Sequence, residues 1–363
     1  MTRSAIGAMR EVTDIVRRGT KKASQHKEFC VLVAIDVRNA FNVARWSGIL
    51  ADLEARNVDR HLIEMVRNYL SDRTLVVDEG SRMRLTCGVL QGSILGPLLC
   101  NVYYDNVFRV KMPDGLNLIG YADDLELVAV GKSETELRHK IDTALVDLVE
   151  CLQTKELRIA PEKTEVVLLS GRRKIKEITV TVAREEVRSK NSVKYLGVIF
   201  DKNTRFTEHV KHVMSRANEV ATKLGRLMPN IGGPRSTKRR VLCGAIGSIT
   251  LYAAPIWGGV MGKEKYRQML IRVQRKLALR KCSAYRIVFT EAAQVLAELV
   301  PIDLQVQKRM NAYDTQQGRR EPRWRTMGDW QARCNNLRGR EEWTRTLIAD
   351  VEEWPTRQHG QVG

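Results

Sequence analysis

IGYADDLELVAV, residues 119–130, sets two carboxylates, Asp123 and Asp124, side by side inside an otherwise apolar run. Such a run has the composition of a buried strand, and residues 116–131 together predict a strand hairpin with the aspartates at its tip. Burying two adjacent anions costs several kcal/mol unless a cation compensates them. The pair therefore indicates a bound ligand. The alternative is a solvated turn, where Asp is common.

A third carboxylate ends another apolar segment. FCVLVAIDV, residues 29–37, has the pattern of a fully buried strand that is unbroken by polar residues until Asp36. If the two strands are neighbours in one sheet, three carboxylates converge with no Lys or Arg adjacent in sequence. Mg²⁺ prefers oxygen ligands and typically uses one or two carboxylates together with substrate phosphates. The pattern therefore predicts a divalent metal site at the ends of these strands.

The charge of the chain favours a polyanionic partner. The net charge is +19, and residues 201–300 alone hold 19 Lys/Arg and 6 Asp/Glu, a surplus of +13. A concentrated positive field suits nucleic acid, while a basic surface kept for solubility is the alternative. With 43% hydrophobic and 28% charged residues among 363, the chain has a globular composition and enough length for two compact units.

Cysteine usage and hydropathy argue against zinc and membrane. The seven cysteines are scattered, with no Cys-x-x-Cys, so we expect free thiols in a reducing, intracellular compartment and no zinc site. The N-terminus lacks the apolar run of a signal peptide. Residues 241–262 carry no charge over a membrane-spanning length, but glycines and Pro255 interrupt them. We expect a buried helix followed by a turn, and no membrane partner.

Periodicity predicts an α+β unit to about residue 201 and a basic helical unit after it. Apolar spacing and caps predict helices over residues 4–18 (ended by Gly19), 44–54, 59–70, 98–110 and 133–152. Strand patterns occupy residues 74–90 (a hairpin around Glu79-Gly80), 165–170, 178–183 and 192–201. From Phe206 to Leu227 apolar residues step by four and three, as on one face of a helix. The tail after about Gly318 is rich in Arg and Trp.

Five ordered blocks carry a family resemblance. They are DVRNAF (36–41), GVLQGSILGPLLCNVYYDNV (88–107), YADD (121–124), LRIAPEKTEVVLL (157–169) and VKYLGVIFD (193–201). In this order they resemble the palm motifs of reverse transcriptases, most of all those of non-LTR (LINE-type) retrotransposons of arthropods. The similarity runs from near residue 1 to about 315. Among alternative families, group II intron and retroviral polymerases are the nearest. No RNase H-like segment follows residue 315, which counts against a retroviral source.

The resemblance implies a fold and a domain plan. Residues 1–201 would form a right-hand polymerase palm, an antiparallel sheet packed on helices. Residues 202–315 would form an all-α basic thumb, and residues 316–363 a C-terminal helical region with an Arg/Trp-rich tail.

The resemblance also implies roles in the palm. Asp36 and Asp123 would be the principal Mg²⁺ ligands, Asp124 a weaker one, and the Val37 carbonyl would lie near metal. Lys163 matches the lysine that protonates the departing pyrophosphate.

Further residues would hold the substrates. Phe41 would exclude a 2′-hydroxyl of the incoming sugar, and Gln91 and Gly92 would border the nucleotide, glycine permitting close backbone approach. The primer end would lie at Tyr195, Leu196 and Gly197. Thumb contacts to template–primer phosphates would come from the basic residues of the helix after Arg205: Lys211, Arg216, Lys223 and Arg226.

The implied activity is RNA-directed DNA polymerisation, with two Mg²⁺ ions (Mn²⁺ as a substitute), an RNA template, a DNA primer and deoxynucleotides. In such reactions two metal ions clamp the attacking and leaving oxygens of the phosphoryl transfer. Asn42 stands where the family usually has Asp, at a non-catalytic position. Fingers, an endonuclease and a Cys-His knuckle have no counterpart here, so we expect a fragment that binds template–primer but extends it poorly. The alternative is an inactive copy that acts at most as a nucleic-acid-binding protein.

Overall fold

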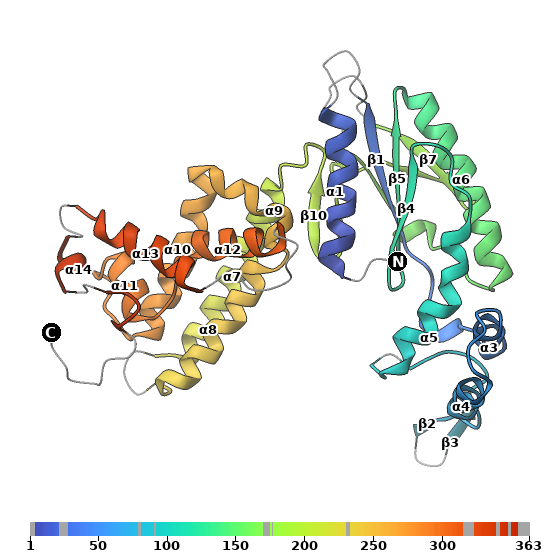
Figure 1. Ribbon diagram of the computed structural model, residues 1–363, viewed down its shortest axis with the longest axis horizontal. Helices are drawn as coiled ribbons and strands as arrows, with labels where there is room; N and C mark the ends of the chain where they lie inside the picture. Colours follow the sequence, from blue (N-terminus) through green and yellow to red (C-terminus); the bar gives the residue numbers. More distant parts are fainter. Residues whose placement is uncertain are drawn as a thin grey trace. The chain divides into compact units, whose positions relative to one another are not determined.

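The computed structural model describes residues 4–21, 28–78, 81–90, 92–169, 175, 177–229, 233–314, 323–338, 342–347 and 350–354. The chain divides into two compact units, Met1–Thr204 and Arg205–Gly363. The first unit is α+β and the second is helical, as the fold class predicted from the sequence requires (Figure 1).

The first unit alternates helices with short strands. Its elements are α1 (Ala5–Lys21), β1 (Phe29–Ile35), α2 (Ala40–Val43), α3 (Trp46–Glu54), α4 (Arg60–Leu70), β2 (Thr74–Asp78), β3 (Ser81–Arg84), α5 (Leu95–Tyr104), η1 (Asp105–Arg109), β4 (Leu116–Tyr121), β5 (Asp124–Gly131), α6 (Glu134–Thr154), η2 (Pro161–Lys163), β6 (Glu165–Leu168), β7 (Thr179–Val182), β8 (Glu185–Arg188), β9 (Ser192–Tyr195) and β10 (Val198–Asp201).

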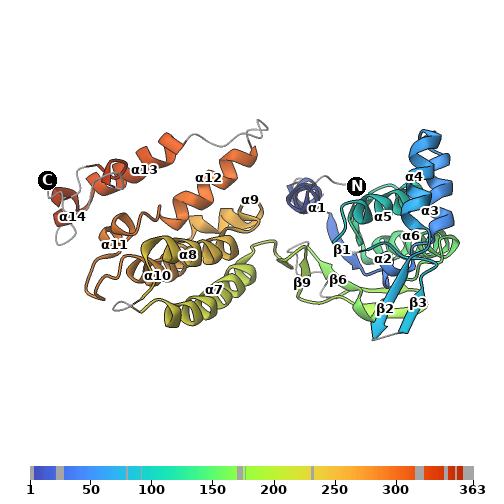
Figure 2. The same ribbon diagram turned by 90° about the horizontal axis from the view of Figure 1, so that it is seen from below.

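A four-stranded antiparallel sheet in the order β4-β5-β1-β6 is the centre of this unit. Alternate residues of β1 face opposite sides. Val31, Val33 and Ile35 share one core cluster with Leu145 and Leu148 of α6. On the other side α1 packs against β1, β4 and β5, so helices cover both faces of the sheet (Figure 2). Two-sided burial explains why β1 and β5 are almost continuously apolar.

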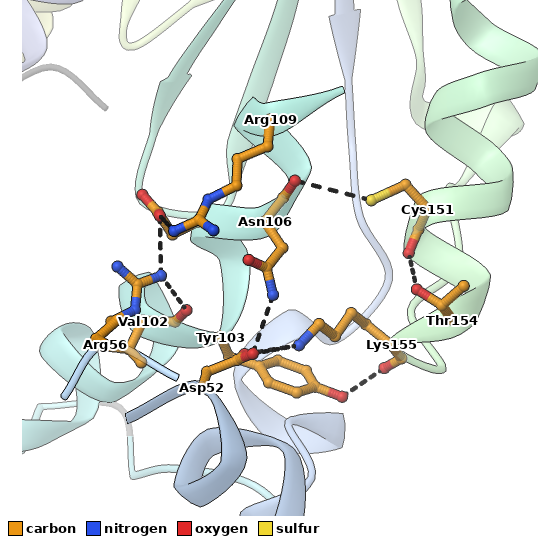
Figure 3. Close-up of polar contacts among 10 residues, drawn as sticks. Asp52, Arg56, Val102, Tyr103, Asn106, Arg109, Cys151, Thr154 and Lys155 are labelled. Carbon is orange, nitrogen blue, oxygen red and sulfur yellow. Dashed lines mark hydrogen bonds and ion pairs between the residues drawn. The ribbon is translucent and has the colours of Figure 1, made fainter. Parts of the chain in front are cut away.

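A buried polar network ties the segment after β1 to α5 and α6 (Figure 3). The Lys155 ammonium donates to both carboxylate oxygens of Asp52, at 2.8 and 2.6 Å, and Asn106 donates to the same carboxylate at 2.9 Å. The Tyr103 hydroxyl donates to the Lys155 carbonyl at 2.6 Å, and its ring lies under the ammonium. Because the ion pair is nearly excluded from water, it fixes α3 against the end of α6.

Two local predictions differ from the structure here, and one strand was not predicted. The first helix does not end at Gly19 but runs to Lys21. A Cβ at Gly19 would lie 3.2 Å from a methyl of Val130 on β5, so α1 approaches the sheet closely at this residue. Residues 192–201 form a hairpin, β9 and β10, rather than one strand. Strand β8, which pairs with β7, has mostly charged residues and was not predicted.

The predicted hairpin at residues 74–90 is confirmed in its strands, β2 and β3, while Glu79 and Gly80 lie outside the described residues. The predicted helix over residues 98–110 begins earlier, at Leu95, and tightens into the 3₁₀ turn η1. All seven cysteines are free.

The second unit is built from helices. They are α7 (Thr207–Leu227), α8 (Ser236–Leu251), α9 (Ala254–Trp257), η3 (Gly258–Gly262), α10 (Glu264–Lys281), α11 (Thr290–Leu296), α12 (Ile302–Asp314), α13 (Arg323–Asn335) and α14 (Glu342–Leu347). Residues beyond 315 pack with this unit, because Trp330 and Cys334 of α13 share a core with Val295. Arg333 also makes a two-pronged ion pair with Asp303 of α12.

The uncharged stretch 241–262 contains the predicted helix and a break after it, but the helix is only partly buried, since Val241 is 70% exposed, and α9 and η3 follow the break. α8 ends at Leu251, and the Trp257 indole donates to the Tyr252 carbonyl at 2.7 Å. Among the described helices none alone is long and apolar enough to cross a membrane. α8 joined to α9 and η3 passes by length and composition, but the two parts are bent by 44° at the break between them.

Candidate active site

Asp36 follows the last residue of the central strand β1. Its backbone carbonyl accepts a hydrogen bond from the Ala160 amide at 2.8 Å, and the Arg38 amide donates to the Arg158 carbonyl at 2.8 Å. These bonds join the end of β1 to the segment that leads into β6. They leave the carbonyl of Val37, whose side chain is buried, outside this pairing. Asp36 is thus held at a fixed strand end while its side chain remains partly exposed.

Asp123 and Asp124 lie at the turn between β4 and β5. Tyr121 pairs with Asp124, so Ala122 and Asp123 form a two-residue turn in which Ala122 has a left-handed φ of 56°. β5 in turn pairs with β1, with Leu125 opposite Ile35. Asp36 follows Ile35 and Asp124 precedes Leu125, and these two neighbours are paired on adjacent strands. The sheet neighbourhood on which the sequence prediction depended is present.

The negative charges of Asp36 and Asp123 act on the carboxyl group of Asp124. The pKa of Asp124 is raised to about 6, first by burial among protein atoms and then by the negative charges of Asp123 and Asp36. The buried Tyr104 hydroxyl on α5 has its pKa raised, mainly by burial and also by Asp123 and Asp36. A raised carboxyl pKa at like charges marks a place where added positive charge is stabilising.

Lys163, to which the family resemblance assigns a role in the same site, lies beside Asp36. Its Nζ atom is 3.4 Å from the Asp36 Oδ2 atom, although both side chains remain substantially exposed. The short turn η2 carries Lys163 and is pinned by two hydrogen bonds from the Arg38 guanidinium to Glu162, at 2.9 Å each. The carboxylates are therefore not without a cation, because tertiary structure supplies one.

The donor set fits a hard divalent cation in part. Carboxylate oxygens are the ligands that Mg²⁺ prefers, and it completes its shell with water and substrate phosphate oxygens. Among the residues that the structure describes, no three His, Cys, Asp or Glu side chains are grouped closely enough to hold one ion together. The arrangement therefore suits an ion shared between protein carboxylates and a phosphate-bearing ligand.

Two backbone hydrogen bonds join the segment around Phe41 to the loop that leads to Gly92. The Val89 amide donates to the Phe41 carbonyl and the Gly88 amide to the Ala44 carbonyl, each at 2.8 Å. The loop that leads to Gly92 is thereby held next to the helix that carries Phe41, whose half-buried ring packs against the core. Gly92 has a φ of 90°, so the turn itself requires glycine. Gln91 lies outside the described residues.

The predicted primer segment is the turn of the β9–β10 hairpin. Leu196 and Gly197 are its central residues, with φ of 44° and 83°, the pattern of a type I′ turn. The Tyr195 ring is 2% exposed and packs inside the unit, so its predicted place at the primer end stays a prediction. Of the three predicted residues, Leu196 is partly exposed and Gly197 is exposed.

Glu126 is a buried acid that the sequence reasoning missed. It lies two residues after Asp124 on the same face of β5 and is 2% exposed. Burial and the charge of Asp124 raise its pKa well above the usual value, while the Tyr195 hydroxyl lowers it. The two side chains face each other without hydrogen-bond geometry, and within the described residues the Glu126 Oε2 atom has no partner. The signal was available, since Glu126 is the one acid within the apolar run that follows Asp124.

The four basic residues predicted to contact nucleic acid are exposed on α7. The opposite side of that helix is buried through Val210, Val213 and Ala217, as its apolar stripe predicts. Arg216 and Lys223 both form ion pairs with Glu219, at 3.8 and 2.7 Å. Exposed pairs of this kind are weak, so they leave both cations available to a stronger anion.

Comparison with known proteins gives a family. Residues 3–200 match the model of reverse transcriptases (RNA-dependent DNA polymerases). A putative 115 kDa protein of the Drosophila melanogaster R1DM retrotransposable element is 28% identical over 285 residues, covering 74% of this chain and 26% of the relative. The probable RNA-directed DNA polymerase of the Drosophila transposon BS is 27% identical, covering 74% and 31%. A Pol polyprotein of the Nasonia vitripennis R1 2 element is 27% identical, covering 64% and 58%.

The chain thus spans about a quarter to three fifths of the length of these relatives. Among solved structures, telomerase of Candida albicans in complex with a fragment of telomeric RNA has a TM-score of 0.41 at 12% identity, covering 95% of this chain and 53% of that one. Apo telomerase of Candida tropicalis has a TM-score of 0.42 at 13% identity, covering 95% and 57%. These scores are too low to carry an argument.

Proposed function

Because the chain belongs to the reverse transcriptase family, and within it to the non-LTR retrotransposon type, we propose that it supplies the nucleotidyl-transfer site of an RNA-directed DNA polymerase. The substrates are a primer 3′-hydroxyl, an RNA template and a deoxynucleoside triphosphate. One observation supports the proposal most: β1 pairs with β5 beside the Asp123-Asp124 turn, and burial, followed by the charges of Asp123 and Asp36, raises the pKa of Asp124.

Reverse transcriptases use divalent metal ions, and Asp36 with Asp123 are the residues that would hold them here. Asp124 and the Val37 carbonyl are the supporting oxygens. Two bound Mg²⁺ ions, or Mn²⁺ in their place, would stabilise the negative charge on the attacking and leaving oxygens.

Lys163 is suited to assist the leaving group. Its ammonium lies 3.4 Å from Asp36, at the edge of the carboxylate cluster, and holds a proton on Nζ. A pyrophosphate that leaves from this point can take up that proton, which lowers the cost of its departure. Pairing with the exposed Asp36 carboxylate is weak enough to be exchanged for phosphate.

The remaining residues position the two substrates. The half-buried Phe41 ring, fixed against the Val89 loop, would lie under the incoming sugar and exclude a 2′-hydroxyl. Gly92, and Gln91 beside it, would border the nucleotide. The exposed backbone of the turn at Leu196 and Gly197 would support the primer end. Positioning of this kind accounts for much of the rate in phosphoryl transfer.

The test is primer extension on an RNA template with Mg²⁺. We expect Asp36→Asn and Asp123→Asn to lower the extension rate by at least about a thousandfold, because the transition-state charge loses its stabilisation. Asp124→Asn should have a smaller effect. Asp114→Asn is the matched control, since this exposed aspartate in the turn before β4 gives the same charge change outside the site. Extension that survives Asp123→Asn would refute the proposed site.

A further inference from the structure

The helical unit contains a wide basic groove. It has a volume of about 870 Å³ and lies between α7, α10 and the segment that follows α10. Five of its lining residues are cationic and none of those described is acidic; the cations are Arg226, Arg275, Lys276, Arg280 and Arg286. Five cations gathered along one groove create a local positive field suited to a chain of phosphates.

The shape of the groove is fixed by its own polar contacts. The Arg275 guanidinium donates to the carbonyls of Arg286 and Val288, at 2.7 and 2.8 Å, and so holds the segment after α10 against the helix. Lys276 donates to Asn218 of α7 at 3.0 Å, which links the two helices. Arg226 and Arg286 are exposed and enter from α7 and from the segment after α10. The groove is therefore preorganised rather than assembled by its ligand.

An exposed aromatic residue is flanked in sequence by two residues of the lining. Tyr285 lies between two lining residues, Ala284 and Arg286, and its side chain is 80% exposed. Ile287, which follows, is 86% exposed. Tyr285 and Ile287 lie on either side of Arg286 in the sequence. Neither side chain carries a charge that would attract phosphates. They are suited to the flat faces of unstacked bases.

We propose that this groove binds single-stranded nucleic acid, with the backbone along the arginines and a base stacked on Tyr285. The inference rests on the proposed function for its class of ligand, and it adds a site separate from the carboxylate cluster. A duplex would bring phosphates but hides its base faces, and would leave Tyr285 and Ile287 unused. Of the four α7 cations predicted from the sequence, only Arg226 lines this groove.

Binding of labelled strands of about twelve nucleotides to the full chain tests the stacking contact. We use single-stranded RNA, single-stranded DNA of the same sequence, and the RNA–DNA duplex, without deoxynucleotides. Tyr285→Ala should weaken binding of the single strands by about 5- to 100-fold, the usual effect of losing one base–aromatic stack. Duplex binding should change by less than about twofold, because a duplex offers no base face to Tyr285. Tyr285→Trp should restore single-strand affinity, which a merely structural role of the tyrosine would not predict.

The backbone contact is tested by charge. Arg226→Gln with Arg286→Gln should flatten the salt dependence of single-strand binding by about 1.4 log units per decade, since each phosphate contact contributes roughly 0.7. Lys238→Gln with Lys265→Gln is the control, because both lysines are exposed in the same unit and neither lines the groove. An equal effect of the control pair would show that only general charge matters and would overturn the proposal.

The outcomes also separate this site from the proposed function. Equal affinity for RNA and DNA would identify backbone and bases as the ligand, and a tenfold preference for RNA would identify the template strand. Both results support the groove. No change with Tyr285→Ala, or a larger loss for duplex than for single strand, would overturn the groove while primer extension by the same preparation stays intact. Single-strand binding retained together with primer extension that is unchanged by Asp123→Asn would instead count against the carboxylate site.

Discussion

At the residue scale, ionisable side chains with shifted pKa values are the most informative feature of this protein. Asp124 and Glu126 on β5 both have raised pKa values, because burial and neighbouring negative charge disfavour their ionised forms. In the helical unit the opposite case occurs at His209, where burial and the charge of His212 lower the pKa to about 4. When the pH is low enough for this histidine to bind a proton in the unfolded chain but not in the folded protein, the folded protein becomes less stable.

His209 predicts a stability change with pH. The folded pKa is about 4 and the ordinary value is 6.5, so stability is complete above pH 6.5 and is lost as pH falls toward 4. The loss near pH 4 is about 3 kcal/mol, since a tenfold change in proton affinity corresponds to roughly 1.4 kcal/mol. In urea unfolding across this range, the loss of stability toward pH 4 should be smaller by about this amount in His209→Phe than in the wild type. His61→Gln, at an exposed histidine on α4, should show the wild-type loss; a His209→Phe profile like the wild type would contradict the assignment.

At the element scale, the sheet alone does not hold the first unit together. The strands set Asp36 and the Asp123-Asp124 turn side by side, but α3 and α5 come from the segment between β1 and β4. Their position depends on the Asp52–Lys155 pair at the end of α6, whose side chains are 10% and 16% exposed. Because α2 and Phe41 lie in the same segment, this pair also supports the predicted nucleotide site.

Breaking that pair should destabilise the protein strongly. Asp52→Asn leaves the Lys155 ammonium buried without its carboxylate, at a cost of about 3–5 kcal/mol in the free energy of unfolding by urea. Arg84→Gln is the control, because the Arg84–Asp72 pair is 75% and 86% exposed and should contribute less than about 1 kcal/mol. Replacing both partners, as Asp52→Leu with Lys155→Met, should recover most of the loss. A loss no larger than that of the control would mean that other contacts hold α3.

At the scale of the whole molecule, the proposed reaction site and most of the positive charge belong to different compact units. The carboxylates belong to Met1–Thr204, while most of the surplus of positive charge follows Arg205. Phosphate contacts supply affinity without sequence preference, and carboxylates with metal supply the reaction. This division predicts that nucleic-acid affinity and catalytic rate respond to different substitutions.

Duplex binding should therefore depend on the outer cations of α7. Neutralising Lys211, Arg216 and Lys223 should flatten the salt dependence of duplex binding by up to about 0.9 log unit per lost phosphate contact on B-DNA. Asp36→Asn, tested in the same titration, should leave that slope unchanged because it lies in the other unit. If the slope survives the three substitutions, the charge on this side of α7 is only a solvated surface.

The sequence by itself determined the fold class, the family and the order of the site residues. Apolar runs that end in Asp36 and Asp123 predict paired strands, and the stepping of Val210, Val213 and Ala217 predicts α7, because both signals are local periodicities. The ends of the helices and the chain reversal within residues 192–201 could not be predicted as well from the sequence. Gly19 lies inside α1, and the β9–β10 turn depends on left-handed angles at Leu196 and Gly197.

Only the tertiary structure decided which distant segments meet. Lys163 approaches Asp36 because residues 158–160 pair with the end of β1, and Tyr195 turns inward to face Glu126. The basic groove arises where α7 and α10 pack together with the segment that Arg275 holds in place. No local pattern encodes these contacts, because each depends on burial and charge contributed by residues far apart in the chain.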